Sequence, residues 1–544
     1  MHRPMHRRGD LAVRVGLAAL ALGLAALQPV LGPSTPAGAG SAHPGTSAQS
    51  DDPATTTTPG GTALPVAVDP ALLTGLDGVV ALSPPESCLR VDIARATVFR
   101  HQADRALVPA STQKVVVGQV ALDRLGADHR FRTRVLGPAP VDGVVTGDVA
   151  LVGGGDPLLT TATYAFVRRT AEQPLTFLDA LADALVAGGV RRVTGRIVAD
   201  DTRYDALRTV PSWPERYQRE NQVGPLGALT VDDGFRLDLP AEGSDDAPVR
   251  RRVDDPALHA AEQLNALLFA RGVVVDGGVA VGPAPPGAGE LAAIDSAPLG
   301  DVVRQMLEES DNETAELLTK ELGVQAGTGG STAAGTAAIV ARAGELGVPT
   351  AGTVMADGSG LDRTNHTSCD ALVGALVTSG GVDGAIGSRL PVAGRSGTLR
   401  DRFLGTPAQG RLRAKTGSLN SVTALAGFVT MSDGRTATFA YIANGPQAED
   451  PRRGQDFLGA LLGQYEQACD DTPGEPLVAP VGSYVVQSAA LAAVPLAGLL
   501  APALEASLRA FEDHPEVAVS ACLAGAPGFT LWFPGLAPTT DLPG

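Results

Sequence analysis

The 544-residue chain contains 44% hydrophobic and 19% charged residues, a balance typical of globular proteins rather than disordered ones. Its length allows two or three domains, and an aromatic content of 4% indicates cores built from Ala, Val and Leu. The formal net charge of −17 argues against non-specific binding to nucleic acid or to anionic lipid.

The first 39 residues have the pattern of an export signal. Basic residues in MHRPMHRRGD precede the apolar run VGLAALALGLAALQPVL, and small residues around Ala39 offer a cleavage site. An uncleaved membrane anchor is the alternative, because the run is close to the lower limit for a span. With either outcome, the bulk of the chain is expected outside the cytoplasm, in the cell wall or a periplasm-like space.

Residues 40–70 are rich in Pro, Thr, Gly and Ala and predict a flexible linker without a core. The first ordered elements are expected in two β-rich runs, GVVALS (residues 78–83) and SCLRVDIARATVFRH (residues 87–101). A helix is then predicted from Ser111 to about Gly126, where a glycine ends it.

The middle of the chain mixes strand and helix patterns. GDVALVGGGDP and RRVTGRIVAD predict strands, whereas TFLDALADALVAGGV and DPALHAAEQLNALLFARGV predict helices. The glycines of LVGGGDP are expected in a turn, since the GK[ST] ending of a phosphate-binding loop is missing.

The C-terminal half begins with helices on both sides of EESDNETAELLTKELG and through STAAGTAAIVARAGELGV. Three antiparallel strands follow in RLRAKTGSL, VTALAGFVTM and TATFAYIANG, and RRGQDFLGALLGQYEQACD predicts a closing helix. Helices combined with a β-meander predict an α+β fold. Residues 471–544 are favoured as a poorly ordered tail, with a membrane-associated segment as the alternative.

Four cysteines, Cys88, Cys369, Cys469 and Cys522, are widely spaced and form no CxxC pair. The histidines form no HExxH motif, so a metal site is not expected, and the serine chemistry inferred below needs no organic cofactor. In an oxidising compartment one or two disulfides are possible, and buried free thiols are an equal alternative.

Lysine is rare in this chain, because only Lys114, Lys320 and Lys415 occur among its 42 basic residues. Lys114 follows Ser111 by three residues at the start of a predicted helix, so the hydroxyl and the amine can meet on one face. A lysine whose pKa is lowered can act as the base for a serine nucleophile, whereas arginine cannot. A surface lysine is the plain alternative for SxxK on its own.

Two further motifs accompany SxxK. Ser310-Asp311-Asn312 supplies a hydroxyl and an amide between two predicted helices. Lys415-Thr416-Gly417-Ser418 begins a predicted strand, where the glycine permits close backbone approach and the lysine can hold a carboxylate. The order SxxK, SDN, KTG is the signature of penicillin-recognising serine acyl-transferases. Lys320, in ELLTKELG, is expected to be an ordinary exposed helix residue.

Several blocks extend the likeness beyond the three motifs: PASTQK, GDVALVGGGDP, MLEESDNETAE, DGSGLDRTN, LPVAGRSGTL and RAKTGSLNSVTALAGF. Over about residues 75–470 the chain resembles the low-molecular-mass class C penicillin-binding proteins, the D-alanyl-D-alanine carboxypeptidase/endopeptidase family. The resemblance implies a β-lactamase-like transpeptidase domain (residues 71–131 and 292–470) interrupted by an inserted α/β domain (residues 132–291). The interval from Ser111 to Ser310 is shorter than in the family's well-known members, with the shortfall after LTVDDGFRLDLP, so the family's third domain is expected to be reduced or absent.

The resemblance also implies roles for single residues. Ser111 would be the nucleophile and Lys114 its base, Ser310 would relay a proton to the leaving amine, and Asn312 would hold the acyl amide. Lys415 and Thr416 would bind the terminal carboxylate of the substrate. Gly417 would permit the close approach, and the backbone N–H groups of Ser111 and Ser418 would form an oxyanion hole.

The substrates implied are peptidoglycan stem peptides that end in D-Ala-D-Ala, with β-lactams as covalent inhibitors. A serine β-lactamase is the nearest alternative; its deacylation needs a glutamate, and Glu345 lies at a conceivable distance after SDN but at an ordinary helix end. A non-catalytic cell-wall-binding protein is the second alternative. The serines of DGSG and RSG are expected in turns near the site rather than as a second nucleophile.

Overall fold

The computed structural model describes residues 69–464 apart from residues 171, 242, 243, 245 and 446–451, together with two short paired strands, β18 (Leu477–Val478) and β19 (Val485–Val486). The chain divides into two units, Met1–Leu64 and Pro65–Gly544, and the described residues belong to the second. The predicted export signal, nearly all of the linker and most of the tail lie outside the described residues. The same holds for Cys469 and Cys522.

A five-stranded antiparallel sheet with the order β15-β16-β17-β1-β2 joins the two ends of the described chain. Its strands are β1 (Glu86–Ile93), β2 (Ala96–His101), β15 (Leu412–Leu419), β16 (Val422–Thr430) and β17 (Thr436–Asn444). The last three confirm the predicted meander. Strand β15, which carries the KTG motif, is an edge strand.

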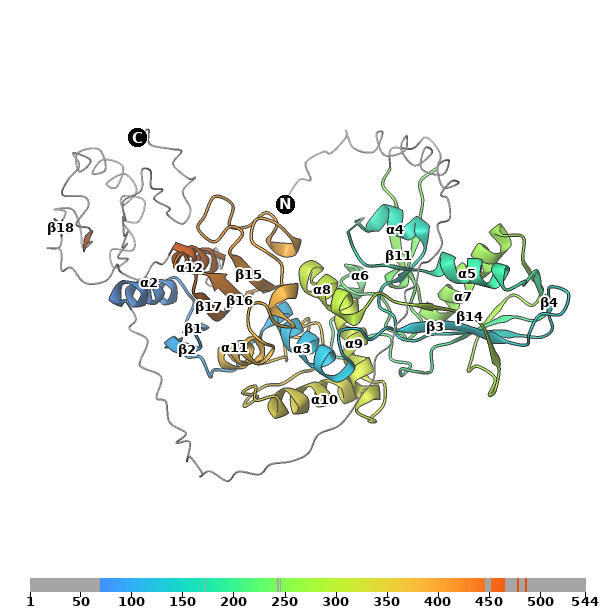
Figure 1. The fold of residues 1–544 in the computed structure, drawn as a ribbon, viewed down its shortest axis with the longest axis horizontal. Coiled ribbons are helices and arrows are strands. Elements are labelled where there is room, and N and C mark those ends of the chain that lie inside the picture. The colour runs from blue at the N-terminus through green and yellow to red at the C-terminus, as the bar shows by residue number, and fades with distance from the viewer. Residues whose placement is uncertain are drawn as a thin grey trace, which may run out of the picture. The chain divides into compact units, whose positions relative to one another are not determined.

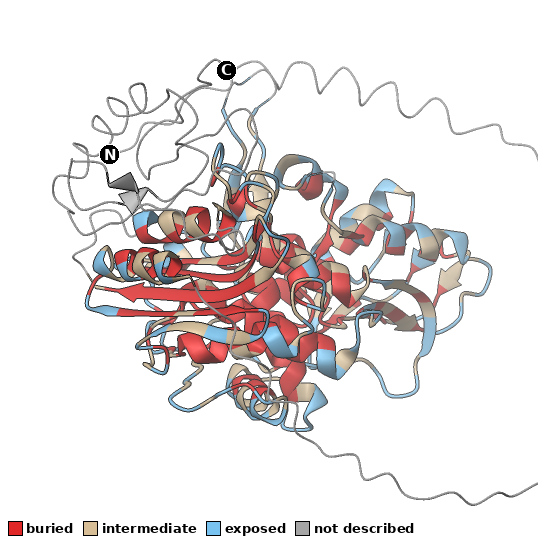
Figure 2. Ribbon diagram, turned by 60° about the vertical axis from the view of Figure 1, so that its left-hand side comes forward, coloured by how far each residue is buried: buried red, intermediate tan, exposed pale blue. Residues whose placement is uncertain are grey.

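Both faces of this sheet are covered, so its strands β1, β16 and β17 are almost entirely buried, whereas the edge strand β2 has no fully buried residue (Figure 2). Side chains alternate between the faces: Ala424, Ala426 and Phe428 of β16 belong to one apolar core, and Leu425 and Val429 to another. Helices α3 and α11 lie over the first face, and α2 and α12 over the second (Figure 1). Burial on two faces explains why the strands are near-continuous apolar runs.

The helices predicted around this sheet from Ser111 onward are present, and α11 is an additional helix that was not predicted. The chain enters a 3₁₀ helix, η1 (Ala110–Gln113), which continues into α3 (Lys114–Leu125) and stops at Gly126, whose φ is +85°. The others are α8 (Leu299–Glu309), α9 (Asn312–Gln325), α10 (Thr332–Glu345), α11 (Cys369–Thr378), α12 (Arg452–Gln464), η3 (Gly387–Arg389) and η4 (Gly397–Leu399). Helices and an antiparallel sheet together confirm the α+β class.

One predicted strand is wrong. The segment GVVALS lies largely in helix α2 (Pro70–Ala81), which starts where a flexible linker was expected to end. Asp69 caps this helix by accepting a hydrogen bond from the Ala71 N–H at 2.8 Å, and Pro70 takes the first helical position. Leu72, Leu76 and Val79 are buried against the sheet. The capping signal and the helical spacing of these side chains outweigh the strand propensity of two adjacent valines.

A second sheet, mixed and five-stranded, lies in the segment between α3 and α8 with the order β13-β9-β5-β3-β14. Its strands are β3 (Arg132–Gly137), β5 (Val149–Val152), β9 (Ile197–Asp200), β13 (Val279–Val281) and β14 (Gly289–Asp295). The predicted helices appear as α5 (Leu178–Ala187) and α7 (Pro256–Ala270), which share a separate apolar core with this sheet. This segment therefore has its own core.

The predicted strand RRVTGRIVAD is divided in two. Its first part is β8 (Arg192–Val193), in a small parallel sheet with β4 (Val144–Val145) and β12 (Val274–Val275), and its second part is β9. Gly195 separates them, where a Cβ atom would lie only 2.3 Å from the Gly147 carbonyl carbon. The first strand therefore ends where the backbone at Gly195 passes close to that at Gly147. The hydrophobic pattern of the sequence does not indicate such a contact.

The remaining elements of this segment are short: β6 (Leu159–Thr160), α4 (Ala162–Arg168), β7 (Thr176–Phe177), α6 (Arg216–Arg219), η2 (Asp232–Gly234), β10 (Phe235–Asp238) and β11 (Val249–Arg252). Strands β10 and β11 pair as an antiparallel hairpin. Within the described residues, no helix has the length and apolar character needed to cross a membrane.

Candidate active site

Ser111 sits on a sharply bent turn that leads into α3. The residue before it, Ala110, is buried with φ at +48°, a left-handed conformation that costs about 1 kcal/mol or more for a residue with a Cβ atom. Two glycines enclose the bend: a Cβ atom at Gly360 would lie 2.0 Å from the Ala110 carbonyl oxygen, and one at Gly417 2.7 Å from that of Pro109. The predicted close approach at Gly417 is thus present.

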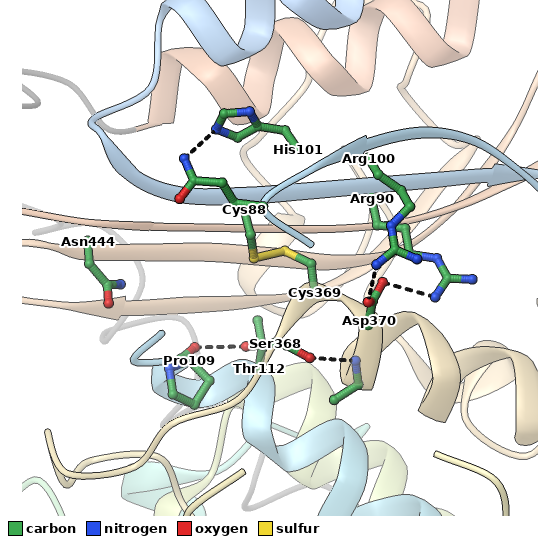
Figure 3. The surroundings of a disulfide bond; sticks show 12 residues. Cys88, Arg90, Arg100, His101, Pro109, Thr112, Ser368, Cys369, Asp370 and Asn444 are labelled. Atoms are coloured by element: carbon green, nitrogen blue, oxygen red, sulfur yellow. Dashed lines mark hydrogen bonds and ion pairs between the residues drawn. A yellow bond between two sulfur atoms is a disulfide. The ribbon is translucent and has the colours of Figure 1, made fainter. Parts of the chain in front are cut away.

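The segment leading into this turn is anchored to the sheet. The Val108 N–H donates to Asn444 Oδ1 at 2.8 Å, and Asn444 Nδ2 donates back to the Val108 carbonyl at 3.1 Å. Behind them, a disulfide joins Cys88 of β1 to Cys369 at the start of α11 (Figure 3). Of the alternatives left open by the sequence, these two cysteines adopt the disulfide.

Lys114 is 0% exposed, and its amine points back at the nucleophile. Its Nζ donates to Ser111 Oγ at 3.0 Å, to Asn312 Oδ1 at 2.8 Å and to the Ser359 carbonyl at 2.6 Å. All three acceptors are uncharged oxygen atoms. Burial lowers the pKa of Lys114 to about 8, against the opposing effect of nearby carboxylates. The amine can therefore lose its proton near neutral pH and accept the proton of Ser111.

The SDN motif occupies the junction between α8 and α9. Ser310 is half-buried and ends α8 in a left-handed conformation (φ 59°), and Asp311 caps α9 by accepting from the Thr314 N–H at 3.1 Å. This geometry directs Asn312 into the site, where its Oδ1 meets Lys114. Its Nδ2 donates to the Gln222 carbonyl at 2.9 Å. None of these contacts involves the Ser310 side chain.

On the opposite side of the site, β15 presents the KTG motif along its free edge. Lys415 is 0% exposed and donates to the Thr416 carbonyl at 2.9 Å. Burial, and secondarily the charge of Lys114, hold the pKa of Lys415 well below its usual range. A substrate carboxylate would pair with this ammonium group and stabilise its charge. Thr416 Oγ1 lies 2.9 Å from Thr398 Oγ1 in η4.

Strand alternation also shows in which direction the Ser418 N–H points. The Ala393 N–H donates to the Leu412 carbonyl, and the Ala414 N–H donates to the Pro391 carbonyl. Leu412 and Ala414 of β15 therefore direct these backbone groups away from β16. The period of two places the N–H of Ser418 on the same outer edge. Ser418 is exposed, and its neighbour Gly417 packs against η1.

A family model described as D-Ala-D-Ala carboxypeptidase 3 (S13) matches residues 90–244 and 238–465. The chain belongs to this S13 family. It is 32% identical over 469 residues to a D-alanyl-D-alanine carboxypeptidase of Actinomadura sp. (strain R39), covering 73% of this chain and 83% of that protein. It is 33% identical over 386 residues to carboxypeptidase DacB of Mycolicibacterium smegmatis, covering 68% and 77%.

The fold is similar to that of penicillin-binding protein 4 from Haemophilus influenzae, with a TM-score of 0.60 and 21% identity over 71% of this chain and 97% of that one. The predicted family membership and the predicted β-lactamase-like fold are thereby confirmed. This S13 protein is a serine-type D-Ala-D-Ala carboxypeptidase, as the three motifs indicate.

Two parts of the site were missed by the sequence interpretation. The first is the turn of residues 357–360 (DGSG), expected only near the site, whose Ser359 carbonyl contacts Lys114 directly. The second is residues 221–224, which follow α6 and carry the Gln222 carbonyl that binds Asn312. The backbone of this segment is held by Arg252, which donates to the Val223 carbonyl at 2.7 Å, and by Glu313, which accepts from the Gly224 N–H at 3.2 Å. No sequence motif indicates backbone ligands of this kind.

The expectation for Lys320 is wrong. It is 0% exposed and forms an ion pair with Asp205, whose side chain is 28% exposed. Its neighbour Glu321 is also buried and pairs with Arg203 at 2.6 Å. The two ion pairs connect the far end of α9 to the loop after β9. Helix α9 is packed on opposite faces, so the polar residues in its sequence do not indicate an exposed surface.

The alternative roles find no support in the described part of the chain. Glu345 lies on the surface, where it pairs with Arg342 at 2.8 Å and Arg124 at 3.4 Å, and so does not serve as a deacylating base. Among the described residues, no three His, Cys, Asp or Glu side chains are grouped so that they could hold a metal ion.

Proposed function

We propose that this S13 peptidase hydrolyses the terminal D-Ala-D-Ala bond of peptidoglycan stem peptides through an acyl-enzyme on Ser111. The observation that carries the proposal is the 3.0 Å contact between Lys114 Nζ and Ser111 Oγ, together with burial that brings the pKa of the amine to about 8. Neutral Lys114 accepts the Ser111 proton as Oγ attacks the amide carbonyl.

Charge that develops on the carbonyl oxygen is stabilised by the backbone N–H groups of Ser111 and Ser418. When the tetrahedral intermediate collapses, the C–N bond breaks, and Ser310 relays a proton from Lys114 to the leaving D-alanine amine. The substrate carboxylate is held by Lys415 and the hydroxyl of Thr416. Water then attacks the ester carbonyl, and Ser111 recovers its proton as the shortened peptide leaves.

Asn312 has a role that depends on occupancy. Without substrate, its amide is shared between Lys114 and the Gln222 carbonyl. A substrate amide carbonyl that replaces the Gln222 contact would receive the Nδ2 donor, while Oδ1 continues to orient Lys114. The same groups accept a β-lactam, which presents a strained amide and a carboxylate at a similar separation, and the product is a stable acyl-enzyme.

Two further proposals concern the context of the enzyme. The chain is exported, as its N-terminal pattern predicts, and acts at the cell wall. The third domain of the family is reduced to the β10–β11 hairpin. This is supported by the two segments matched by the family model, which meet at residues 238–244, inside this hairpin.

A fluorescent penicillin tests the proposal. We expect a stable covalent label on the wild-type enzyme, lost in Ser111→Ala, together with release of D-alanine from a peptide ending in D-Ala-D-Ala. Rapid turnover of the penicillin would instead identify a β-lactamase, and the absence of any adduct on folded protein would identify a non-catalytic protein.

A further inference from the structure

Glu316 is a buried carboxyl group close to the reacting atoms that the mechanism above does not use. It lies on α9 one turn after Asn312, and it is 0% exposed. Its Oε1 accepts hydrogen bonds from the Gly358 N–H at 3.0 Å and from the Ser359 N–H at 2.7 Å. The carbonyl of the same Ser359 accepts from Lys114 Nζ at 2.6 Å. Glu316 is therefore one residue removed from the proposed base.

The turn of residues 357–360 is held by a second carboxyl group, and the two groups differ. Asp357 receives donors on both oxygens, among them Trp213 Nε1 and Asn365 Nδ2, each at 2.7 Å. Glu316 has backbone donors on Oε1 alone, its buried Oε2 makes no hydrogen bond among the described residues, and the neighbouring Ser359 hydroxyl is close enough to lower its pKa. Donors stabilise an ionised carboxylate, so of the two groups Glu316 is the one better suited to gain a proton.

The charged groups around the pair formed by Lys114 and Glu316 come from each element packed on it: Asp357 of the turn, Asp311 at the start of α9 and, beyond Lys114, Lys415 of β15. Burial, and then Asp357, raise the pKa of Glu316 to about 8. Because burial lowers the pKa of Lys114 to about 8, the carboxyl group and the amine change charge in the same pH range. Their protonation is expected to be coupled.

We propose that Glu316 is a positioning residue for the general base: it orients the Lys114 amine through the 357–360 turn, and its negative charge sets how readily that amine loses its proton. This inference rests on the proposed role of Lys114 as the base. When Glu316 is ionised, it stabilises the ammonium form of Lys114. When it is protonated, the neutral amine is favoured, which is the form that can activate Ser111.

The test is the acylation rate constant with a fluorescent penicillin, measured from pH 6 to 10 on the full-length enzyme. Glu316→Gln keeps an amide oxygen for the Gly358 and Ser359 N–H groups but cannot carry charge. We expect the midpoint of its acidic limb to fall by about one pH unit, because an opposite charge near Lys114 has been removed. The rate at the plateau should stay within about threefold. Glu316→Ala, which also releases the turn, should lower the plateau by about tenfold or more.

Glu321→Gln is the matched control, since Glu321 is a buried carboxyl on the same helix that pairs with Arg203 instead. Its midpoint should equal that of wild type, measured per folded molecule. A wild-type midpoint in Glu316→Gln would overturn the inference and leave the proposed function intact. Near-normal acylation by folded Lys114→Arg would instead remove the base itself.

If Glu316→Gln does not fold, Glu316→Asp supplies the decision. This variant keeps the charge but shortens the reach to the turn by one methylene group. The midpoint should then stay at the wild-type value while the plateau falls, because orientation is lost and charge is not. An unchanged plateau in Glu316→Asp would overturn the positioning role.

Discussion

Two buried lysines lie at helix α9: Lys114 of α3 contacts its first turn, and Lys320 belongs to its second half. Comparison of the two separates a catalytic lysine from a structural one. At the first turn of α9, Lys114 donates only to neutral oxygen atoms of Ser111, Asn312 and Ser359. At the other end, Lys320 contacts the carboxylate of Asp205. Both lysines are 0% exposed, so burial does not distinguish them.

The partner decides what a buried amine can do. A direct carboxylate partner keeps an ammonium group charged, whereas neutral acceptors satisfy its hydrogen bonds without fully repaying the cost of burying its charge. Around Lys114 the carboxyl groups of Glu316 and Asp357 are present but are bonded to backbone N–H groups. The enzyme thus keeps two carboxyl groups near its base without a direct contact that would hold the proton on the amine.

The largest effect is expected when the structural lysine loses its partner. Asp205→Ala leaves the Lys320 ammonium group buried and unpaired, which costs about 3–5 kcal/mol for a buried ion pair broken on one side. Urea unfolding should show this loss, whereas penicillin acylation per folded molecule should stay close to wild type. A loss below about 1 kcal/mol would mean that the pair contributes no more than a surface ion pair.

Lys114→Arg comes next. The substitution retains the positive charge and adds bulk, but guanidinium does not deprotonate at accessible pH. Acylation by penicillin should fall by about 100-fold or more, the scale for loss of a general base. The measurement is the second-order acylation rate on protein whose thermal unfolding confirms that it is folded. A near wild-type rate would show that the lysine is not the base.

The pH dependence should follow the Lys114 amine. Because burial lowers its pKa to about 8, the amine is protonated and inactive as a base below that value and neutral above it. The acylation rate should therefore rise with pH, by about tenfold per unit while it is well below pH 8, and level off above it. A rate that is flat between pH 6 and pH 9 would contradict this assignment.

If Lys415 binds the substrate carboxylate, kcat/KM should depend on that carboxylate being charged. Amidation of the C-terminal D-alanine removes the charged partner of a buried amine and should cost about 1.5–3 kcal/mol in transition-state binding. Comparison of kcat/KM for the acid and the amide of one peptide measures this cost. Equal values would exclude Lys415 from carboxylate recognition.

Much of this site could be predicted because its chemistry is written in contiguous motifs. SxxK places Ser111 and Lys114 three residues apart on one helical turn, and the glycine of KTG marks a real backbone contact. The meander and most helices follow from periodicity and stop signals. These features depend on local geometry, so a single sequence contains them.

What escaped prediction depends on contacts between distant segments. The Ser359 and Gln222 carbonyls are backbone ligands, and any residue type could supply them. The burial of Lys320 depends on a loop more than 100 positions earlier in the chain, which covers α9 from outside. Helix α2 was missed because the adjacent valines of GVVALS favour a strand when the segment is considered alone, whereas in the fold its apolar face packs against α12 and β2.

The smallest effect is expected for Lys320→Arg, which returns the comparison to its starting point. Arginine retains the positive charge and can keep the ion pair with Asp205, so the Asp205 carboxylate is not left without its partner. The larger guanidinium group must still fit a fully buried position, and overpacking of this kind costs about 1–2 kcal/mol. We therefore expect a modest decrease in unfolding free energy, and an acylation rate per folded molecule within about twofold of wild type. If the rate falls as far as it does in Lys114→Arg, the part of α9 around Lys320 takes part in the chemistry, because both substitutions keep the charge of a fully buried side chain and only Lys114 is expected to need a titrating amine.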